Sequence, residues 1–216
     1  MIRKRYRLLL AFLVSGCAAC ASAPVRYYTL TPAGATPPTP IQGAGITINV
    51  RTIVPVPLNH GNLMVRTGET EMTLLENARW VSPVSDELSN AVRLQLQRRW
   101  AQSMEPDRLH VFTQISVNVD VERLESELGR YTLLEVSWSA KLSGMTSAPS
   151  DITVSHCVFR AREAIHSGFA EMVEGYQRDA RALGDAIFVT LTRAGDINEV
   201  TCGTWPRISQ ELPFTD

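Results

Sequence analysis

Four cysteines carry the most distinctive chemistry in this 216-residue chain, and their positions divide them into two pairs. Cys17 and Cys20 lie near the amino end, whereas Cys157 and Cys202 lie in the last third of the sequence. In an exported protein the second pair can form a disulfide, with two buried free thiols as the alternative. His156 precedes Cys157, but neighbouring residues on a strand point to opposite faces. A metal or nucleophilic site at this cysteine is therefore disfavoured.

The segment before Cys17 has the features of an export signal. A basic start is followed by an apolar run from Leu8 to Val14 and by the small residues Ser15 and Gly16. A helix needs about 20 apolar residues to cross a bilayer, so this run is too short for a stable anchor. We therefore predict that residues 1–16 form a signal peptide that is removed.

The order of these residues resembles bacterial lipoprotein precursors. In those proteins the cysteine thiol takes a diacylglyceryl group, cleavage occurs before the cysteine, and the new amine is acylated. The resemblance implies lipidation of Cys17, and acyl chains on one residue would anchor the protein to a bilayer. The alternative is a secretory signal cut at an Ala-x-Ala-like site near Ala19, Ala21 and Ala23, with Cys20 as a second candidate for lipidation.

Acidic residues cluster on one predicted strand, where paired carboxylates can serve acid–base catalysis. They are Asp120, Glu122, Glu125 and Glu127. Catalytic carboxylates need a pocket that shifts their proton affinity, whereas these residues fall on an exposed row or in the following turn. The common nucleophile, phosphate-loop and zinc motifs do not occur in the sequence. We therefore expect no enzymatic activity, no cofactor and no metal.

Charge excludes one class of partner. Removal of residues 1–16 leaves 17 basic residues against 22 acidic ones, a net charge of −5. Nucleic-acid binding requires clustered lysine and arginine to contact phosphates. Nucleic acid is therefore not an expected partner.

Hydrophobic periodicity predicts an α/β (α+β) fold, with a mostly antiparallel sheet covered by two long amphipathic helices. Period-two runs predict strands near residues 46–50, 63–66, 109–121, 134–142 and 152–164. The first two are expected to form a hairpin within Ile46 to Leu75. One helix is predicted to begin after Ser82 and Pro83, and another to cover residues 169–191. The polar residues on these helices, Glu87 and Asp179 among them, are assigned to the solvent-facing side.

Domain boundaries follow from composition. Residues 17–45 are rich in proline and glycine and are predicted to be an extended tether. A β-prone run, Arg26 to Leu30, is an exception that can pair with a sheet edge. Residues 46–206 are expected to form a single domain, and residues 207–216 a C-terminal tail.

Several segments, taken in order, resemble the ABC-type transport auxiliary lipoprotein family, which includes the PqiC-like lipoproteins. They are the lipobox at Cys17, Tyr27-Tyr28-Thr29-Leu30, Ile53-Val54-Pro55-Val56-Pro57, Arg79-Trp80-Val81-Ser82-Pro83 and the late helix from Phe169 to Leu191. The resemblance covers nearly the whole chain after the leader.

The resemblance implies an outer-membrane lipoprotein on the periplasmic face. It also implies an MCE-domain protein and an inner-membrane ABC transporter as partners in moving lipids, and assembly into a ring of identical chains. Ala18 after the cysteine, instead of aspartate, is similar to lipoproteins released to the outer membrane. An exposed strand edge can dock another chain, so we expect the Ile46 to Leu75 hairpin to serve self-assembly or partner binding.

Two other functional classes remain open from the sequence. One is a lipoprotein that activates a cell-wall synthase, and the other is a tethered envelope hydrolase. Co-purification with an MCE protein instead of a penicillin-binding protein would exclude the first. A deep pocket holding Asp, His and Ser side chains would favour the second.

Overall fold

The computed structural model describes residues 23–34, 46–103, 114–144, 152–194 and Cys202. Within these residues the strongest period-two runs form a four-stranded sheet, which consists of β2 (Thr47–Ile53), β5 (Gln114–Glu127), β6 (Tyr131–Ser143) and β7 (Ile152–Ala164), in that order. β5, β6 and β7 are joined antiparallel, as expected for consecutive strands with short connections. β2 lies parallel to β5.

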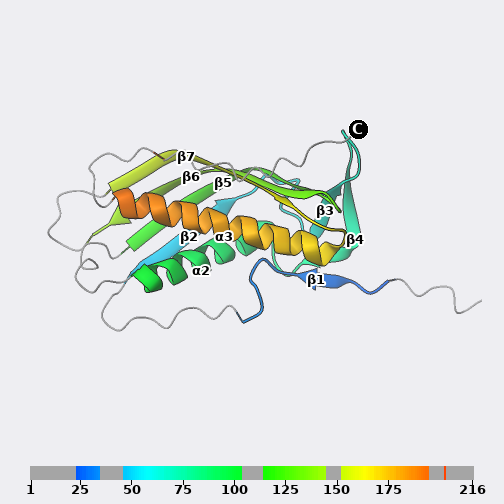
Figure 1. Cartoon of the computed structure of the whole chain (residues 1–216), viewed down its shortest axis with the longest axis horizontal. Coiled ribbons are helices and arrows are strands. Elements are labelled where there is room, and N and C mark those ends of the chain that lie inside the picture. Colours follow the sequence, from blue (N-terminus) through cyan, green and yellow to red (C-terminus); the bar gives the residue numbers. More distant parts are fainter. Residues whose placement is uncertain (1–22, 35–45, 104–113, 145–151, 195–201, 203–216) are drawn as a thin grey trace, which may run out of the picture.

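A smaller sheet lies at one end of the molecule (Figure 1). Its strands are β1 (Arg26–Tyr28), β4 (Met72–Trp80) and β3 (Asn62–Arg66), in that order. β3 and β4 are antiparallel, and β1 is added in parallel at the edge of β4. The short β-prone run thus pairs with a sheet edge as predicted.

Two long helices cover one face of the four-stranded sheet (Figure 1). α2 (Val84–Ser103) contacts β2, and α3 (Phe169–Ala194) contacts β6 and β7. The two helices also contact each other. Both begin at the end of the molecule that holds the small sheet (Figure 1).

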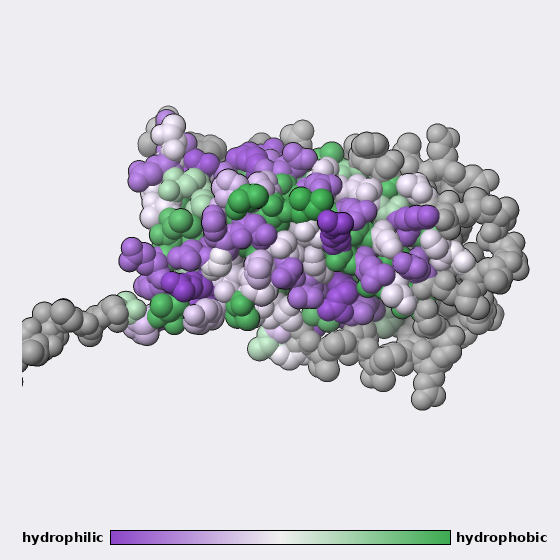
Figure 2. Space-filling view, turned by 180° about the vertical axis from the view of Figure 1, so that it is seen from behind, coloured by the Kyte–Doolittle hydropathy of each residue, from purple (hydrophilic) through white to green (hydrophobic). Residues whose placement is uncertain are grey.

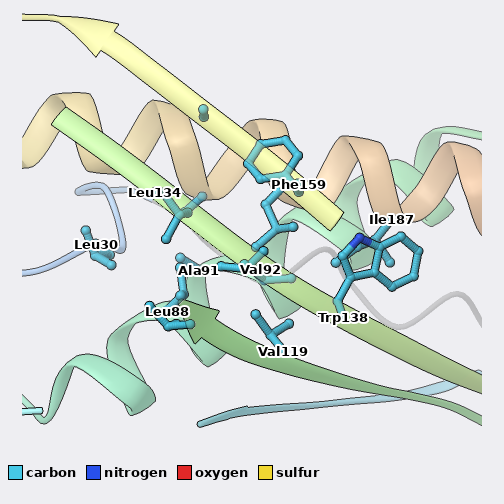
Figure 3. Close-up of a cluster of buried hydrophobic side chains, with 14 of the residues drawn as sticks. Leu30, Leu88, Ala91, Val92, Val119, Leu134, Trp138, Phe159 and Ile187 are labelled. Atoms are coloured by element: carbon cyan, nitrogen blue, oxygen red, sulfur yellow. The ribbon is translucent and has the colours of Figure 1, made fainter. Parts of the chain in front are cut away.

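The core lies between the helices and the inward-facing rows of the strands (Figure 3). Val119 and Trp138 come from neighbouring strands, Leu88 and Val92 from α2, and Ile187 from α3. Leu88, Val92, Val119 and Ile187 are at most 1% exposed, so the helical and strand periods meet in one apolar layer. The predicted α+β class, with a mostly antiparallel sheet and two long helices, is confirmed.

The predicted hairpin within Ile46 to Leu75 is wrong. β2 joins the large sheet, whereas β3 pairs with β4 in the small sheet. Alternating residues define a strand with one buried face, but they do not identify its partner. The strand β4 was also missed, and the predicted strand 109–121 appears as β5, which begins at Gln114 in the described part of the chain.

Candidate anchoring and docking surfaces

A buried carboxylate holds the N-terminal segment against the body of the protein. Oε2 of Glu87 on α2 accepts hydrogen bonds from the hydroxyl of Thr29 at 2.7 Å and the main-chain amide of Leu30 at 2.8 Å. Its other oxygen, Oε1, accepts a 2.7 Å hydrogen bond from the hydroxyl of Ser82. Gln177 on α3 donates a 2.9 Å hydrogen bond to the carbonyl of Thr29. Since Leu30 is only 3% exposed, this segment belongs to the folded body and not to a free tether.

The first turn of α2 explains why Glu87 is in place. The carbonyl of Pro83 accepts hydrogen bonds from the amides of Asp86 and Glu87, which begins the helix. The free amide of Ser85 donates to Oδ1 of Asn59 in the loop between β2 and β3, so that side chain caps the helix. Ser82, the predicted cap, instead donates to Glu87.

A chain of charges crosses the large sheet on the face turned away from the helices. Glu125 on β5 accepts hydrogen bonds from Arg66 at 2.7 Å, Arg123 at 2.8 Å and Tyr131 at 3.0 Å. Arg123 continues the chain to Glu135, which also pairs with Arg160. Hydrophilic side chains predominate on this face (Figure 2).

Glu125 corrects the assignment of the acidic cluster. The register of β5 shifts between Val121 and Arg123, which changes the alternation of buried and exposed positions along the strand. The shift turns Glu125 to the face away from the helices, where it is only 8% exposed because Arg66 of β3, Arg123 and Tyr131 lie against its carboxylate. Burial alone would raise its pKa, but the hydrogen bonds from Arg66, Arg123 and Tyr131 lower it below the ordinary value. An ionised carboxylate held by two arginines stabilises the sheet and is not a proton donor at neutral pH.

A third buried acidic group, Asp179, lies on α3 and faces the large sheet. Asp179 is 0% exposed; its Oδ2 accepts a 3.0 Å hydrogen bond from Thr132 on β6, and its Oδ1 has no hydrogen-bond partner among the described residues. Burial is the main reason that the pKa of Asp179 is raised to about 7. The negative charge of Glu163 also raises this pKa, whereas the hydrogen bond from Thr132 and the positive charge of Arg178 lower it. Burial likewise raises the pKa of the neighbouring Tyr176.

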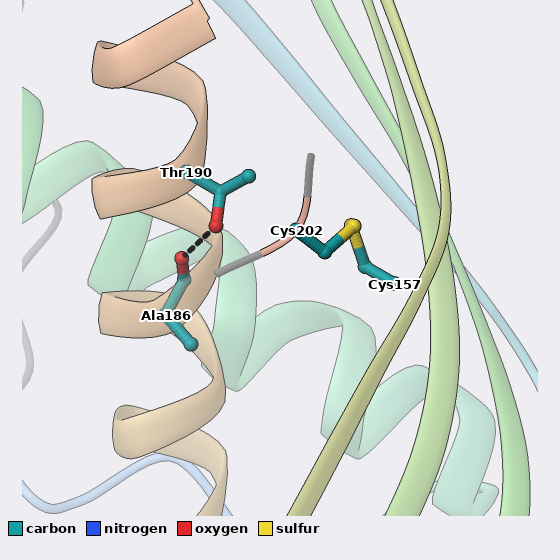
Figure 4. Close-up of a disulfide and its surroundings, with 4 residues drawn as sticks. All are labelled: Cys157, Ala186, Thr190 and Cys202. Atoms are coloured by element: carbon teal, nitrogen blue, oxygen red, sulfur yellow. Dashed lines mark hydrogen bonds between the residues drawn. A yellow bond between two sulfur atoms is a disulfide. The ribbon is translucent and has the colours of Figure 1, made fainter. Parts of the chain in front are cut away.

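The structure joins Cys157 and Cys202 in a disulfide, with 5.4 Å between their Cα atoms (Figure 4). Cys157 lies on β7 and is 1% exposed, so the bond fixes Cys202 against the sheet across 45 residues of sequence. The predicted lipidation site, Cys17, lies outside the described residues, as do the leader and residues 35–45.

The described residues show no group of three or more His, Cys, Asp or Glu side chains that could hold a metal ion. None of their helices is long and apolar enough to cross a membrane.

Glu87 and Asp179 were both wrongly assigned to solvent-facing helix sides. Each lies at helical spacing from core residues: Glu87 precedes Ala91 by four positions, and Asp179 precedes Leu183 by four. That spacing places both carboxylates on the buried faces. The prediction was wrong because it followed the general tendency of acidic side chains to be solvent-exposed and not their spacing on the helix.

The fold and contacts thus describe an α+β body with a fixed N-terminal strap, Arg26 to Leu30. The chain belongs to the ABC-type transport auxiliary lipoprotein component family, whose model matches residues 28–188. The match includes the strap residues Tyr28 to Leu30 and most of α3. No curated protein matches the chain significantly.

Three solved structures resemble this chain at low sequence identity, and the first of them shares its fold. A protein of unknown function is 18% identical with a TM-score of 0.57, and the match covers 78% of this chain and 99% of that one. A Xanthomonas campestris protein is 16% identical, with a TM-score of 0.48 over 73% of this chain and 91% of its own. A candidate lipoprotein from Caulobacter crescentus is 14% identical, with a TM-score of 0.34 over 50% of this chain and 83% of its own.

Proposed function

We propose that this protein is acylated at Cys17 and held on the periplasmic face of the outer membrane. There it acts without catalysis as an auxiliary subunit of an ABC transport system that moves lipids between the two membranes. The observation that carries this proposal is the family match over residues 28–188. The leader before Cys17 supports it.

The fixed strap gives the anchor a mechanical role. Because β1 pairs with β4 and Glu87 holds Thr29 and Leu30, a pull on the amino end is passed to the whole body. The anchor can thus hold the body in place while partners engage its other surfaces.

An MCE-domain protein and the inner-membrane transporter are the proposed partners, and the chain is proposed to form a ring with its own copies. Open strand edges support this, since unpaired main-chain groups can accept another strand. In the part of the chain that the structure describes, β2 pairs only with β5 and leaves its other edge open. This edge replaces the mistaken hairpin as the proposed assembly surface.

Anchoring is tested by intact mass and by fractionation of the envelope. The mature wild-type chain should begin at Cys17 and carry acyl groups, whereas Cys17→Ser should lose them and Cys20→Ser should retain them. Ala18→Asp should move the protein from outer-membrane to inner-membrane fractions. An unmodified thiol at Cys17 in the mature product would contradict the proposal.

Partner choice and assembly need a second experiment. Affinity purification of the acylated protein should recover an MCE-domain protein and not a penicillin-binding protein. Light scattering in detergent should show an oligomer that Ile53→Lys disrupts, because this half-exposed side chain ends the open strand β2. Leu74→Lys, at a similarly exposed residue on β4, is the matched control. A monomeric wild-type protein would contradict the ring.

A further inference from the structure

Three exposed hydrophobic side chains lie close to the point where the described chain begins. Val25 is 42% exposed, Tyr27 62% and Val81 64%. Figure 2 shows hydrophobic and hydrophilic side chains side by side at this end of the molecule. Such exposure on a single strand pair needs a physical explanation, because large apolar side chains lose free energy in water.

The pairing of β1 with β4 places these residues on one face. Tyr27 is the register partner of Arg79, and the amide of Val81 donates a 2.9 Å hydrogen bond to the carbonyl of Tyr28. Trp80, between Arg79 and Val81, points into the core and is 6% exposed. Its two neighbours therefore point outward, beside Tyr27. We name Val25, Tyr27, Arg79 and Val81 the β1–β4 patch.

Two arginines lie in or next to the patch. Arg79 lies within it and Arg26 lies on β1, and both side chains are exposed. Neither forms an ion pair with another described residue. Apolar and aromatic side chains next to unpaired arginines fit the boundary between lipid headgroups and acyl chains, especially where the headgroups are anionic.

The position of Cys17 indicates what covers the patch. Val25 follows Cys17 by eight residues, a stretch that spans at most about 28 Å when fully extended. If Cys17 is acylated as proposed above, this short connection keeps the patch near the bilayer at a millimolar effective concentration. Even a weak contact with lipid would then be well populated.

We propose that the β1–β4 patch rests on the phospholipid surface that holds the acyl chains of Cys17. Val25, Tyr27 and Val81 enter the headgroup region, while Arg79 contacts anionic headgroups. The proposal rests on acylation of Cys17 and adds a second, non-covalent contact that fixes the orientation of the body.

This contact would make the protein stand on one end. β1, β3 and β4 lie at one end, and α2 and α3 run from there to the opposite end (Figure 1). With the small sheet on the membrane, the far ends of both helices and of the large sheet point into the periplasm, where partners approach.

The test measures whether residue 27 of the acylated full chain touches lipid. In a Cys20→Ser background, Tyr27→Cys and Asn118→Cys each receive an environment-sensitive fluorophore; Asn118 is an exposed residue of β5 and serves as the control. The proteins are bound to phosphatidylethanolamine and phosphatidylglycerol vesicles that contain a lipid with a nitroxide headgroup. We expect the label at position 27 to shift to shorter wavelength and to lose about half or more of its emission, because a tethered contact is occupied most of the time. The label at position 118 should change little.

A charge variant tests the patch itself. Val81→Glu should restore the emission of the position 27 label, whereas Leu74→Glu, at an exposed residue further along β4, should not. Vesicle flotation of both variants should remain unchanged, because the acyl chains still hold them.

The outcomes separate the two proposals. Labels at positions 27 and 118 that are equally unquenched, on protein that floats with the vesicles, would overturn the patch and leave the anchor intact. Protein that does not float would overturn both. A short-wavelength label at position 27 in the unacylated Cys17→Ser protein without vesicles would show that another protein surface covers the patch, which also overturns it.

Discussion

The main-chain amide of Leu30 donates a 2.8 Å hydrogen bond to Oε2 of Glu87, 57 residues later in the sequence. This bond crosses from the N-terminal strap to the first turn of α2. The same oxygen also accepts from the hydroxyl of Thr29. One buried carboxylate therefore accepts hydrogen bonds from two neighbouring residues of the strap.

Replacement of Glu87 should release the strap. Glu87→Ala leaves the buried amide of Leu30 without an acceptor, and we expect a loss of about 2–3 kcal/mol in the free energy of unfolding. Glu87→Gln retains one carbonyl oxygen for Thr29 and Leu30, so its loss should be about 1 kcal/mol. Urea unfolding measures both values, and hydrogen exchange at Leu30 reports the local release. Glu174→Ala, at an exposed position on α3, is the control; unchanged exchange in Glu87→Ala would contradict the clamp.

Asp179 should make stability fall as the pH rises. Its folded-state pKa is raised from 3.8 to about 7, so the folded protein binds the extra proton between these values. The favourable contribution is complete below about pH 4 and is lost as the pH rises to about 7, a change of the order of 4 kcal/mol. Asp179→Asn should remove most of this slope and should unfold at higher urea than wild type at pH 8.

Urea titrations at pH 5 and pH 8 measure this difference for both proteins. Glu174→Gln, an exposed residue on the same helix, should retain the wild-type slope. Identical slopes for wild type and Asp179→Asn would exclude this residue as the source.

Gly175 lies where α3 approaches β6 most closely. A Cβ atom there would come within 2.8 Å of Oγ1 of Thr132 and 2.9 Å of Cγ2 of Ile165. Alanine favours a helix by about 1 kcal/mol over glycine, but the overlap should cost about 1–3 kcal/mol. We expect Gly175→Ala to lower the thermal midpoint, measured by circular dichroism. Gly61→Ala, where a Cβ would meet no atom within 4 Å, is the control; a higher midpoint for Gly175→Ala would show that the helices shift easily.

The disulfide between Cys157 and Cys202 closes a loop across 45 residues. Loss of such a constraint should lower the free energy of unfolding by about 4 kcal/mol in the chain-entropy estimate. The double variant Cys157→Ser and Cys202→Ser avoids a leftover thiol and should unfold at lower urea. A reducing agent should weaken the wild type in the same way and leave the double variant unchanged. Equal sensitivity of both proteins to the reducing agent would contradict the assignment.

Local patterns in the sequence predicted the elements but not all of their partners. β6, β7 and α3 follow periods of two and 3.6 residues over many positions, and consecutive strands usually pair. β2 satisfies the same period in either sheet, so only long-range packing decides that it joins β5. The β-bulge that turns Glu125 away from the helices has no equivalent signal in the sequence.

The sequence indicates the chemistry of the cysteines, but it does not indicate the contacts of Glu87 or the β1–β4 patch. The spacing before Cys17 predicts lipidation, and this prediction lies outside the described residues. The two late cysteines allowed the disulfide that joins Cys157 and Cys202. The clamp at Glu87 depends on a hydrogen bond between segments far apart in sequence. The β1–β4 patch likewise depends on a parallel pairing that brings Tyr27 beside Arg79.

The parallel addition of β2 to β5 also bears on the order in which the molecule folds. Ile48 pairs with Ile115, whereas Glu127 at the end of β5 pairs with Tyr131 only a turn away. Closing a long loop costs more entropy than closing a tight turn, so the β5–β6–β7 meander should form the folding nucleus and β2 should attach late. φ-values near one for Val136 and near zero for Ile48 would show that the meander forms before β2 attaches. The reverse order would refute it. The amino-terminal half of the chain would then complete its fold on a template made by the carboxy-terminal half.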